Sequence, residues 1–111
     1  MHKIATEKKN NCFGFKFSVN KNGAEIARGF LYVLYNNLHQ EPFGLIEDVF
    51  VEENARGMGY GLKILKKIIK ESKKLGCYKL IATSRYSRKK VHNFYKKLGF
   101  KDYGKEFRMD F

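Results

Sequence analysis

The sequence predicts an α+β fold, in which a mixed, mainly antiparallel sheet carries two main helices. Three observations lead to this fold class: a strand-and-hairpin pattern at the start, an apolar run followed by glycines and an amphipathic helix in the middle, and a second helix pattern near the end. With 111 residues and no internal repeat, we expect a single domain over residues 1–111. A chain of this size buries about 60% or more of its unfolded surface, so it can form a real core.

The first half of the chain predicts three antiparallel strands. In residues 12–19, phenylalanine and valine alternate with small or polar residues, as in a half-buried strand. The Asn/Gly turn at residues 20–23 predicts a hairpin that leads into a second strand at residues 24–35. After a polar loop, the β-branched and aliphatic run at residues 45–51 predicts the third strand, which Glu52 ends.

The second half of the chain predicts two helices with a strand after each. Leucines and isoleucines at three- and four-residue steps predict a first helix that ends at about Leu75 and carries lysines on its outer side. Residues 78–83 predict a strand. Ser87 is placed to cap a second helix, which Gly99 ends. Residues 100–111 predict a closing strand, which gives the order β-β-β-α-β-α-β.

The segment Arg56-Gly57-Met58-Gly59-Tyr60-Gly61 joins the third strand to the first helix and predicts an anion-binding corner. Glycines at alternate positions let backbone N–H groups approach a bulky anion without interference from a Cβ. The helix start adds unpaired N–H groups and the positive end of the helix dipole, and Arg56 adds a charge, so a phosphate or pyrophosphate is the expected ligand. The spacing fits neither the dinucleotide fingerprint nor the P-loop. A tight glycine turn without a ligand is the alternative.

Three motifs, in order along the chain, resemble the GNAT acyltransferase family. Arg56, Gly59 and Gly61 match the family's R/Q-x-x-G-x-G/A signature between a strand and a helix. Residues 76–80 (GCYKL) look like the start of the family's next strand, and residues 93–100 (NFYKKLGF) are similar to its late-helix ending. The motif region is most similar to the glucosamine-6-phosphate N-acetyltransferases. The resemblance implies a GNAT-like fold whose N-terminal helices are here reduced or absent.

The resemblance also implies an N-acetyltransferase in which acetyl passes from the cosubstrate acetyl-CoA directly to a primary amine, with no metal. In the family, the strand before the glycine turn holds the pantetheine arm through backbone hydrogen bonds, and by resemblance this role falls on residues 49–51. Together with the glycine corner and the start of the second helix, the expected cosubstrate-binding residues are Val49, Phe50, Val51, Arg56, Gly57, Met58, Gly59, Tyr60, Gly61 and Arg88.

Two residues are candidates for the proton transfers. By resemblance Tyr95 is the general acid for the coenzyme A thiolate, and the alternative is a core aromatic at helical spacing. Glu47 is the candidate base, acting through a water, because strict strand alternation places it with the two valines of its strand. A β-bulge would exchange the faces of this strand, and a purely structural charge is the alternative for Glu47. His39 and His92 are weaker candidates.

The sequence leaves the acceptor amine open. Residues 82–90 (ATSRYSRKK) are basic where the sugar-phosphate enzymes carry an acidic segment, so the aspartate that those enzymes use is missing. Arg88, Lys89 and Lys90 lie at the positive end of a helix dipole, which costs about 0.3–1 kcal/mol per exposed charge. Because a nearby anion relieves this cost, we expect these residues to meet a coenzyme A phosphate or an anionic acceptor.

A formal charge of +12 implies anionic partners, among which coenzyme A, nucleic acid and an acidic substrate all fit. A solvated surface rich in lysine, without a specific partner, is the alternative for most of these lysines. Two alternatives to the enzyme therefore stay open. One is a non-catalytic acyl-CoA-binding or regulatory module. The other is a basic nucleic-acid-binding protein, whose lysines would have to meet exposed aromatics on one surface. A homodimer stays open as well.

The composition gives no sign of a membrane segment or of disulfides. No apolar run reaches about 18 residues, and the charged start does not fit a signal peptide, so we expect a cytoplasmic protein without a membrane partner. Cys12 and Cys77 have no metal-ligand spacing and are expected to be reduced, structural thiols.

Overall fold

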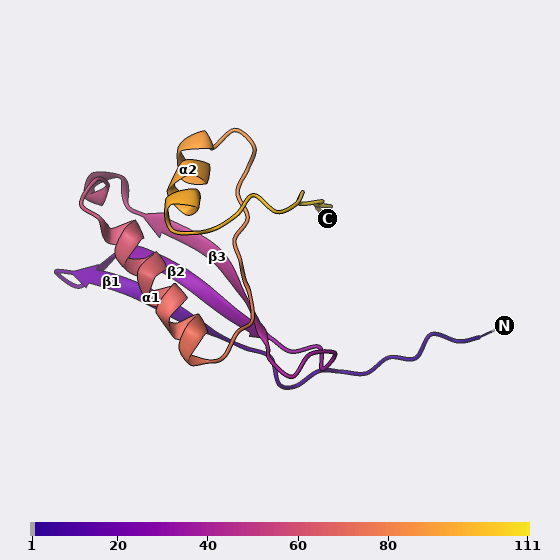
Figure 1. Ribbon diagram of the computed structural model, residues 1–111. Helices are drawn as coiled ribbons and strands as arrows, with labels where there is room; N and C mark the ends of the chain where they lie inside the picture. Colours follow the sequence, from indigo (N-terminus) through magenta and orange to yellow (C-terminus); the bar gives the residue numbers. More distant parts are fainter. Residues whose placement is uncertain (1) are drawn as a thin grey trace.

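The alternating and amphipathic patterns fold into one sheet with two helices in the computed structural model, which describes residues 2–111 (Figure 1). The elements are β1 (Phe13–Lys21), β2 (Ala24–Leu34), β3 (Phe43–Val51), the 3-10 helix η1 (Glu53–Ala55), α1 (Tyr60–Lys74), β4 (Leu80–Ile81) and α2 (Lys89–Lys97). The strand order is β1-β2-β3-β4, with antiparallel pairing along the first three strands and parallel pairing of β3 with β4. The predicted α+β fold, its hairpin and both helices are confirmed.

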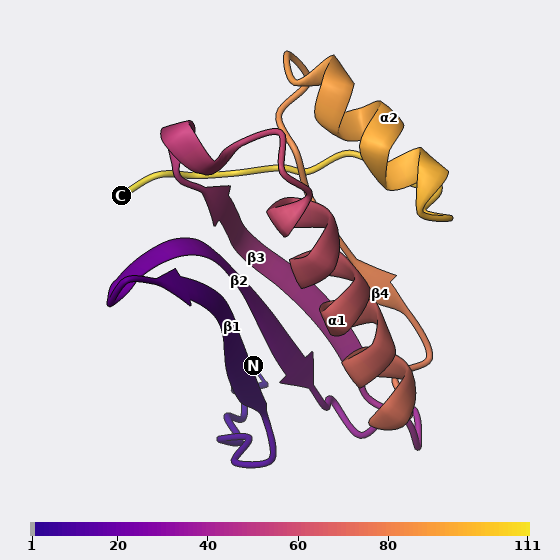
Figure 2. The same ribbon diagram turned by 90° about the vertical axis from the view of Figure 1, so that its left-hand side faces the viewer.

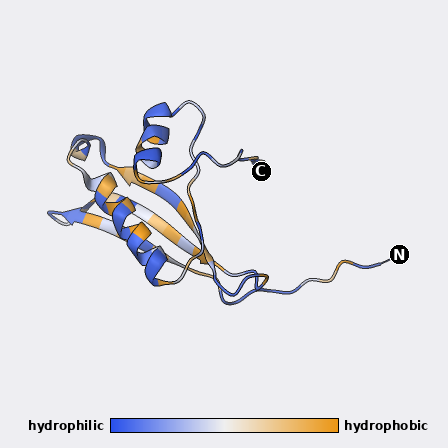
Figure 3. Ribbon diagram, in the orientation of Figure 1, coloured by the Kyte–Doolittle hydropathy of each residue, from blue (hydrophilic) through white to orange (hydrophobic). Residues whose placement is uncertain are grey.

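The core is one layer of helix on one face of the sheet. Side chains of β2 alternate between the two faces, and the apolar stripe of α1 covers one of them. The buried cluster consists of Ala27, Leu31, Val33, Ile46, Ile64, Leu65 and Ile68. Figure 2 shows α1 lying along the sheet, and Figure 3 shows hydrophilic and hydrophobic residues alternating along α1. Each large aliphatic side chain that is buried here contributes about 1.5–3 kcal/mol.

Gly29, in the middle of β2, lets α1 approach the sheet closely. A Cβ at this position would lie 2.6 Å from Ile64 Cγ2 and 3.3 Å from Ile68 Cδ1. Carbon atoms in contact prefer about 3.5–4.0 Å, so a side chain here would force the helix or its isoleucines to move by about 1 Å. The absence of a side chain at Gly29 therefore determines how closely α1 packs on the sheet, and with it the position of the first turn of α1.

A β-bulge interrupts β3 at Asp48, whose φ is 48°. The register of β2 against β3 shifts at this point, so that Asp48 and Val49 together oppose Gly29. The bulge changes the alternation of side chains along β3. Ile46 and Val49 both pack towards α1, although they are three residues apart.

The predicted closing strand at residues 100–111 is wrong. This segment contains no strand, and it leaves the body beyond α2 with large apolar side chains exposed (Figure 1). These side chains are Tyr103, Phe107, Met109 and Phe111. The end of this segment, with Phe107, Met109 and Phe111 at alternate positions, suits a strand. A strand forms only where a neighbouring edge supplies hydrogen bonds, however, and the two residues of β4 offer little edge.

Two further details differ from the prediction. β4 has two residues rather than the six of residues 78–83, because the chain separates from β3 after Ile81. Ser87 does not cap α2, since the N-cap residue is Arg88, which makes no side-chain capping bond. Residues 2–12 form no helix or strand. Within residues 2–111, neither helix has the length and apolarity that a membrane crossing requires.

Candidate active site

The glycine turn forms an open corner at the start of α1. Gly57 and the N-cap residue Gly59 have φ angles of 82° and 84°, in the left-handed region that glycine adopts readily, and a Cβ at either position would meet no atom within 4 Å. The first N–H groups of the helix, those of Tyr60, Gly61 and Leu62, have no intrahelical acceptor. The first helical turn carries no acidic residue. This helix start therefore favours an anion.

Arg56, the first residue of the turn, folds back onto the end of β3. Its Nε donates a hydrogen bond of 2.9 Å to the backbone oxygen of Val51, and its guanidinium lies 5.7 Å from the ring centroid of Phe50. Arg28 lies over the same ring at 4.9 Å. Nothing in the sequence singles out Arg28, because only the pairing of β2 with β3 brings it to this place. Two cations thus flank one ring beside the glycine corner.

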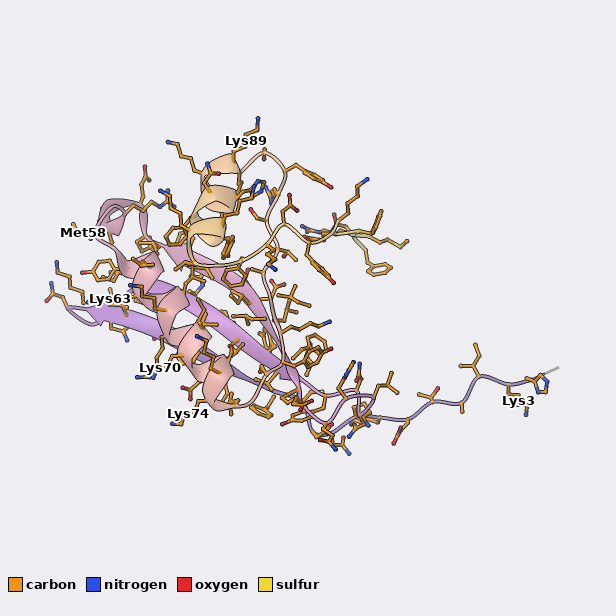
Figure 4. All side chains as sticks on the ribbon, in the orientation of Figure 1. Lys3, Met58, Lys63, Lys70, Lys74 and Lys89 are labelled. Carbon is orange, nitrogen blue, oxygen red and sulfur yellow. The ribbon has the colours of Figure 1, made fainter. Side chains whose placement is uncertain are left out.

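A small hollow of about 120 Å³ lies next to the turn. Its walls are formed by Lys21, Ile26, Asn54, Ala55, Met58 and Tyr60. Met58 is 63% exposed and stands at the outer end of the turn, as labelled in Figure 4. Sites for whole small molecules have volumes of about 300–1,000 Å³, so the hollow has room for one group of a ligand at most.

The edge of β3 that faces β4 is largely open. The two strands pair only at Gly44–Leu80 and Leu45–Ile81. Residues 46–51 continue β3 with no strand beside them on this edge, so their backbone groups there can bond to a ligand. The open edge leads directly to the glycine corner at residues 56–61. The expected cosubstrate residues of β3 and of the turn therefore lie along one continuous path.

The prediction that Glu47 shares a face with the valines of β3 is wrong, and the bulge is the reason. Val49 and Val51 pack towards α1, whereas Glu47 pairs with Phe30 and is exposed on the opposite face. Phe50, between the two valines, also lies on this exposed face. The exchange of faces that a bulge was expected to cause is thus present. Glu47 is accessible to water rather than enclosed.

Tyr95 combines a packing role with a protonated phenol. Burial raises the pKa of Tyr95, against the opposing charge of Arg88, which lowers it. The ring makes an edge contact with Phe100 at 5.3 Å and lies 6.4 Å from Phe94. Figures 1 and 2 both place α2 at the same end of the sheet as the glycine turn. The phenol is therefore protonated at neutral pH, as that of an unperturbed tyrosine also is, and the raised pKa makes it a weaker acid.

The weaker candidates are engaged in local contacts. His92 Nε2 lies 2.7 Å from the backbone oxygen of Arg85, and the ring of His39 lies 4.7 Å from that of Tyr78. Burial raises the pKa of the Cys77 thiol, which disfavours the reactive thiolate. These three side chains stabilise their surroundings and do not converge on the glycine corner.

The start of α2 is strongly basic. Arg88, Lys89 and Lys90 are all exposed, and Lys89 points outward in Figure 4. Arg88 makes no capping bond to the N–H groups of the first turn, so these groups and three cations are presented together. This arrangement suits an anion. Among residues 2–111, no three side chains of His, Cys, Asp or Glu are grouped so as to hold a metal.

Comparisons with known proteins point to one family. The model of the acetyltransferase (GNAT) family matches residues 3–100. The chain is similar to the glucosamine 6-phosphate N-acetyltransferase of Trypanosoma brucei brucei, with 39% identity over 67 residues, which are 60% of this chain and 44% of that protein. It is also similar to the probable glucosamine 6-phosphate N-acetyltransferase 2 of Oryza sativa subsp. japonica, with 36% identity over 61 residues, 55% of this chain and 35% of that protein. The chain thus spans less than half the length of these curated relatives.

Solved structures share the fold. Glucosamine-6-phosphate N-acetyltransferase from Arabidopsis thaliana matches with a TM-score of 0.80 and 25% identity, over 88% of this chain and 67% of that chain. An acetyltransferase of Trypanosoma brucei matches with a TM-score of 0.77 and 29% identity, over 90% and 69% of the two chains. The matched region contains the sheet, the glycine corner and α2. The chain therefore belongs to the GNAT acetyltransferase family.

Proposed function

We propose that this chain is an N-acetyltransferase that moves an acetyl group from acetyl-CoA directly to a primary amine. The observation that carries the proposal is the glycine corner, which continues into the open edge of β3. A pyrophosphate fits the corner because unpaired N–H groups and missing Cβ atoms let its oxygens approach the backbone. A pantetheine arm fits the edge because its amides can take the hydrogen bonds that a neighbouring strand would otherwise make.

The proposed cosubstrate residues are residues 49–51, residues 56–61 and Arg88. Bound acetyl-CoA would supply the activated acetyl group. Tyr95 would donate its phenolic proton to the sulfur as the carbon–sulfur bond breaks. Glu47 would accept, through a water, the proton that the amine loses as the carbon–nitrogen bond forms. Holding the two reactants in line contributes several kcal/mol to the rate without any covalent intermediate on the protein.

The acceptor in this proposal is an amine that also carries negative charge. The relatives named for glucosamine 6-phosphate make an amino-sugar phosphate the first compound to test. The exposed cations of Arg88, Lys89 and Lys90 support an anionic acceptor or a phosphate of the cosubstrate. Residues 82–90 are basic where the glucosamine-6-phosphate N-acetyltransferases that the chain resembles carry carboxylates. Other anionic amines should therefore be tested beside the amino-sugar phosphate.

Thermal unfolding with acetyl-CoA, coenzyme A and ATP, followed by an amine panel with detection of the free thiol, tests the proposal. We expect stabilisation by acetyl-CoA and by coenzyme A, and release of thiol with at least one amine. The stabilisation follows RT ln(1 + [L]/Kd) and is about 2.7 kcal/mol when the ligand is at 100 times its Kd. Absence of a shift with acetyl-CoA at millimolar concentration would contradict the proposal.

A non-catalytic acyl-CoA-binding module remains the second candidate, and the packing of Tyr95 against Phe100 is the observation that favours it. This candidate predicts the same thermal shift with acetyl-CoA. It differs by predicting no thiol release across the whole amine panel. The two functions are therefore separated by the second step of the experiment.

A further inference from the structure

A groove runs between α1 and β1, at the edge of the sheet opposite β4. It has a volume of about 410 Å³. Its floor is apolar and its sides carry lysines; the lining residues are Lys16, Phe17, Ser18, Val19, Lys63, Ile64 and Lys67. The sheet order places two strands, β2 and β3, between this α1–β1 groove and β4. The groove therefore lies on the far side of the sheet from the open edge of β3, although Lys63 and Ile64 follow the glycine corner closely on α1.

A row of three phenyl rings follows β1 from this groove, which Phe17 lines, towards the start of the strand. Phe13, Phe15 and Phe17 share one face of the strand, with centroid distances of 5.6 Å and 6.1 Å between successive rings. β1 is an edge strand, so no further strand covers the outer side of the row. Phe13 is 42% exposed, and the other two rings are half-buried. Phe15 and Phe17 pack partly against the core, so Phe13 and the exposed parts of the other two rings are available to a ligand.

A lysine stripe on α1 runs beside the phenyl row. Lys63, Lys67, Lys70 and Lys74 are exposed and recur at helical steps, and Figure 4 shows three of them along the helix. The stripe is about 16 Å long at 1.5 Å per residue, and the phenyl row is about 14 Å long at 3.4 Å per residue. Because α1 runs antiparallel to β1, the two rows extend together from the groove towards the start of β1.

Few carboxylates oppose these lysines. Glu71 lies 4.0 Å from Lys67, and Glu25 holds Lys16 at 2.5 Å, so Lys16 is already paired. Lys66 and Lys73 add two more exposed cations to the same helix. α1 therefore carries six lysines and one glutamate.

We propose that the lysine stripe and the phenyl row form a binding site for single-stranded nucleic acid. The phosphates lie along the lysines of α1, and bases stack on the rings of β1. Proteins that bind single strands without strong sequence preference combine a basic groove with aromatic platforms in this way. An acidic peptide strand would pair with the edge of β1 but would leave the lysines beyond the groove unmatched, whereas a polyanion meets the whole stripe.

Fluorescence anisotropy with labelled 12-nucleotide oligo-dT and oligo-U tests this proposal on the full chain. If four phosphates are neutralised, the logarithm of the binding constant should fall with the logarithm of salt concentration with a slope of about −3, since single strands give about −0.7 per phosphate. A duplex of the same length should bind more weakly, because its bases cannot reach the rings.

Two variants separate the proposed site from general attraction to a basic protein. The triple variant Lys63→Gln, Lys67→Gln, Lys70→Gln should lose tenfold or more in affinity. Lys3→Gln, Lys8→Gln, Lys9→Gln removes the same charge from the N-terminal segment and should lose much less. Phe13→Leu keeps the charge and an apolar side chain but removes one ring, and should weaken single-strand binding about fivefold or more.

Each variant is first shown to keep the thermal shift with acetyl-CoA, which reports on the other site and on folding. The proposal would be overturned if the two lysine triple variants lost the same affinity for the oligonucleotide. It would also be overturned if duplex and single strand bound equally well and Phe13→Leu had no effect on the affinity. Tighter binding of a peptide with alternating Glu and Phe than of oligo-dT would also overturn it and would identify a strand-docking edge. Because the acetyl-CoA shift is measured separately, failure here leaves the acetyltransferase proposal untouched.

Discussion

Replacing Gly29 by alanine should destabilise the protein from a site that touches no ligand. The new Cβ would lie 2.6 Å from Ile64 Cγ2, and Ile64 is only 3% exposed and cannot move into solvent. Overpacking of this kind costs about 1–3 kcal/mol. Because Gly29 does not have a positive φ, alanine also gains about 0.4–1 kcal/mol by restricting the unfolded chain. The middle of these ranges leaves a net loss of about 1.3 kcal/mol, which lowers Tm by about 5–10 °C for a domain of this size.

Circular dichroism and thermal unfolding measure this loss, with Gly104→Ala as the matched control. A Cβ at Gly104 meets nothing within 4 Å, so the control should change Tm by about 2 °C or less. In the double variant Gly29→Ala, Ile64→Ala the contact atom Cγ2 is absent. The double variant should therefore be more stable than the sum of the two single effects, by about 1 kcal/mol. If Gly29→Ala unfolds at the same temperature as Gly104→Ala, the close seat of α1 on the sheet is not as described.

Three further predictions concern the candidate site. Gly61→Ala should keep or raise Tm, because the new Cβ would make only an ordinary 3.6 Å contact with Val51 Cγ2. The same substitution should weaken acetyl-CoA binding tenfold or more by filling the corner. Isothermal titration measures this affinity, and an unchanged value would show that the corner is not the phosphate site. Tyr95→Phe should lower kcat tenfold or more and leave the KM for acetyl-CoA within about threefold, measured by thiol release, whereas an unchanged kcat would leave Tyr95 as a packing residue only. The pKa of Tyr95 is raised in the folded protein, so above pH about 10 the unfolded state loses this proton first and the free energy of unfolding falls. Urea unfolding should show that this free energy falls less steeply with rising pH in Tyr95→Phe. Equal slopes in the two proteins would argue against the raised pKa.

The sequence predicts the fold where local patterns agree with the final packing. The hairpin, the glycine turn and the stripe of α1 depend on residues close together in the chain, and all three are found. The bulge at Asp48 depends on how β2 and β3 align, so strict alternation placed Glu47 on the wrong face. The sequence pattern does not identify Arg28 for the same reason, because only the pairing of β2 with β3 brings this side chain over the ring of Phe50.

The closing strand shows the limit of pattern reasoning in another way. Within residues 100–111, Phe107, Met109 and Phe111 stand at alternate positions, as in a strand, yet the structure leaves the segment unpaired. Alternation describes which face of a strand an apolar side chain would occupy, but hydrogen bonds to a neighbour decide whether the strand forms. The role of Tyr95 as a proton donor is implied by resemblance and that of Glu47 as a base comes from strand alternation, and both stay predictions until kinetics test them.

The bulge in β3 has a consequence for aggregation through the uncovered strand. An uncovered strand is a template on which other chains add, and proteins limit this with irregular backbone and with charges placed on the bare strand. The uncovered part of β3 carries both, since the kink at Asp48 breaks the regular spacing of its donors and Glu47 and Asp48 put two carboxylates in the middle. A flexible cofactor arm needs only a few of those donors, whereas a second polypeptide needs a regular series. The same irregularity can therefore admit a small thioester and discourage aggregation.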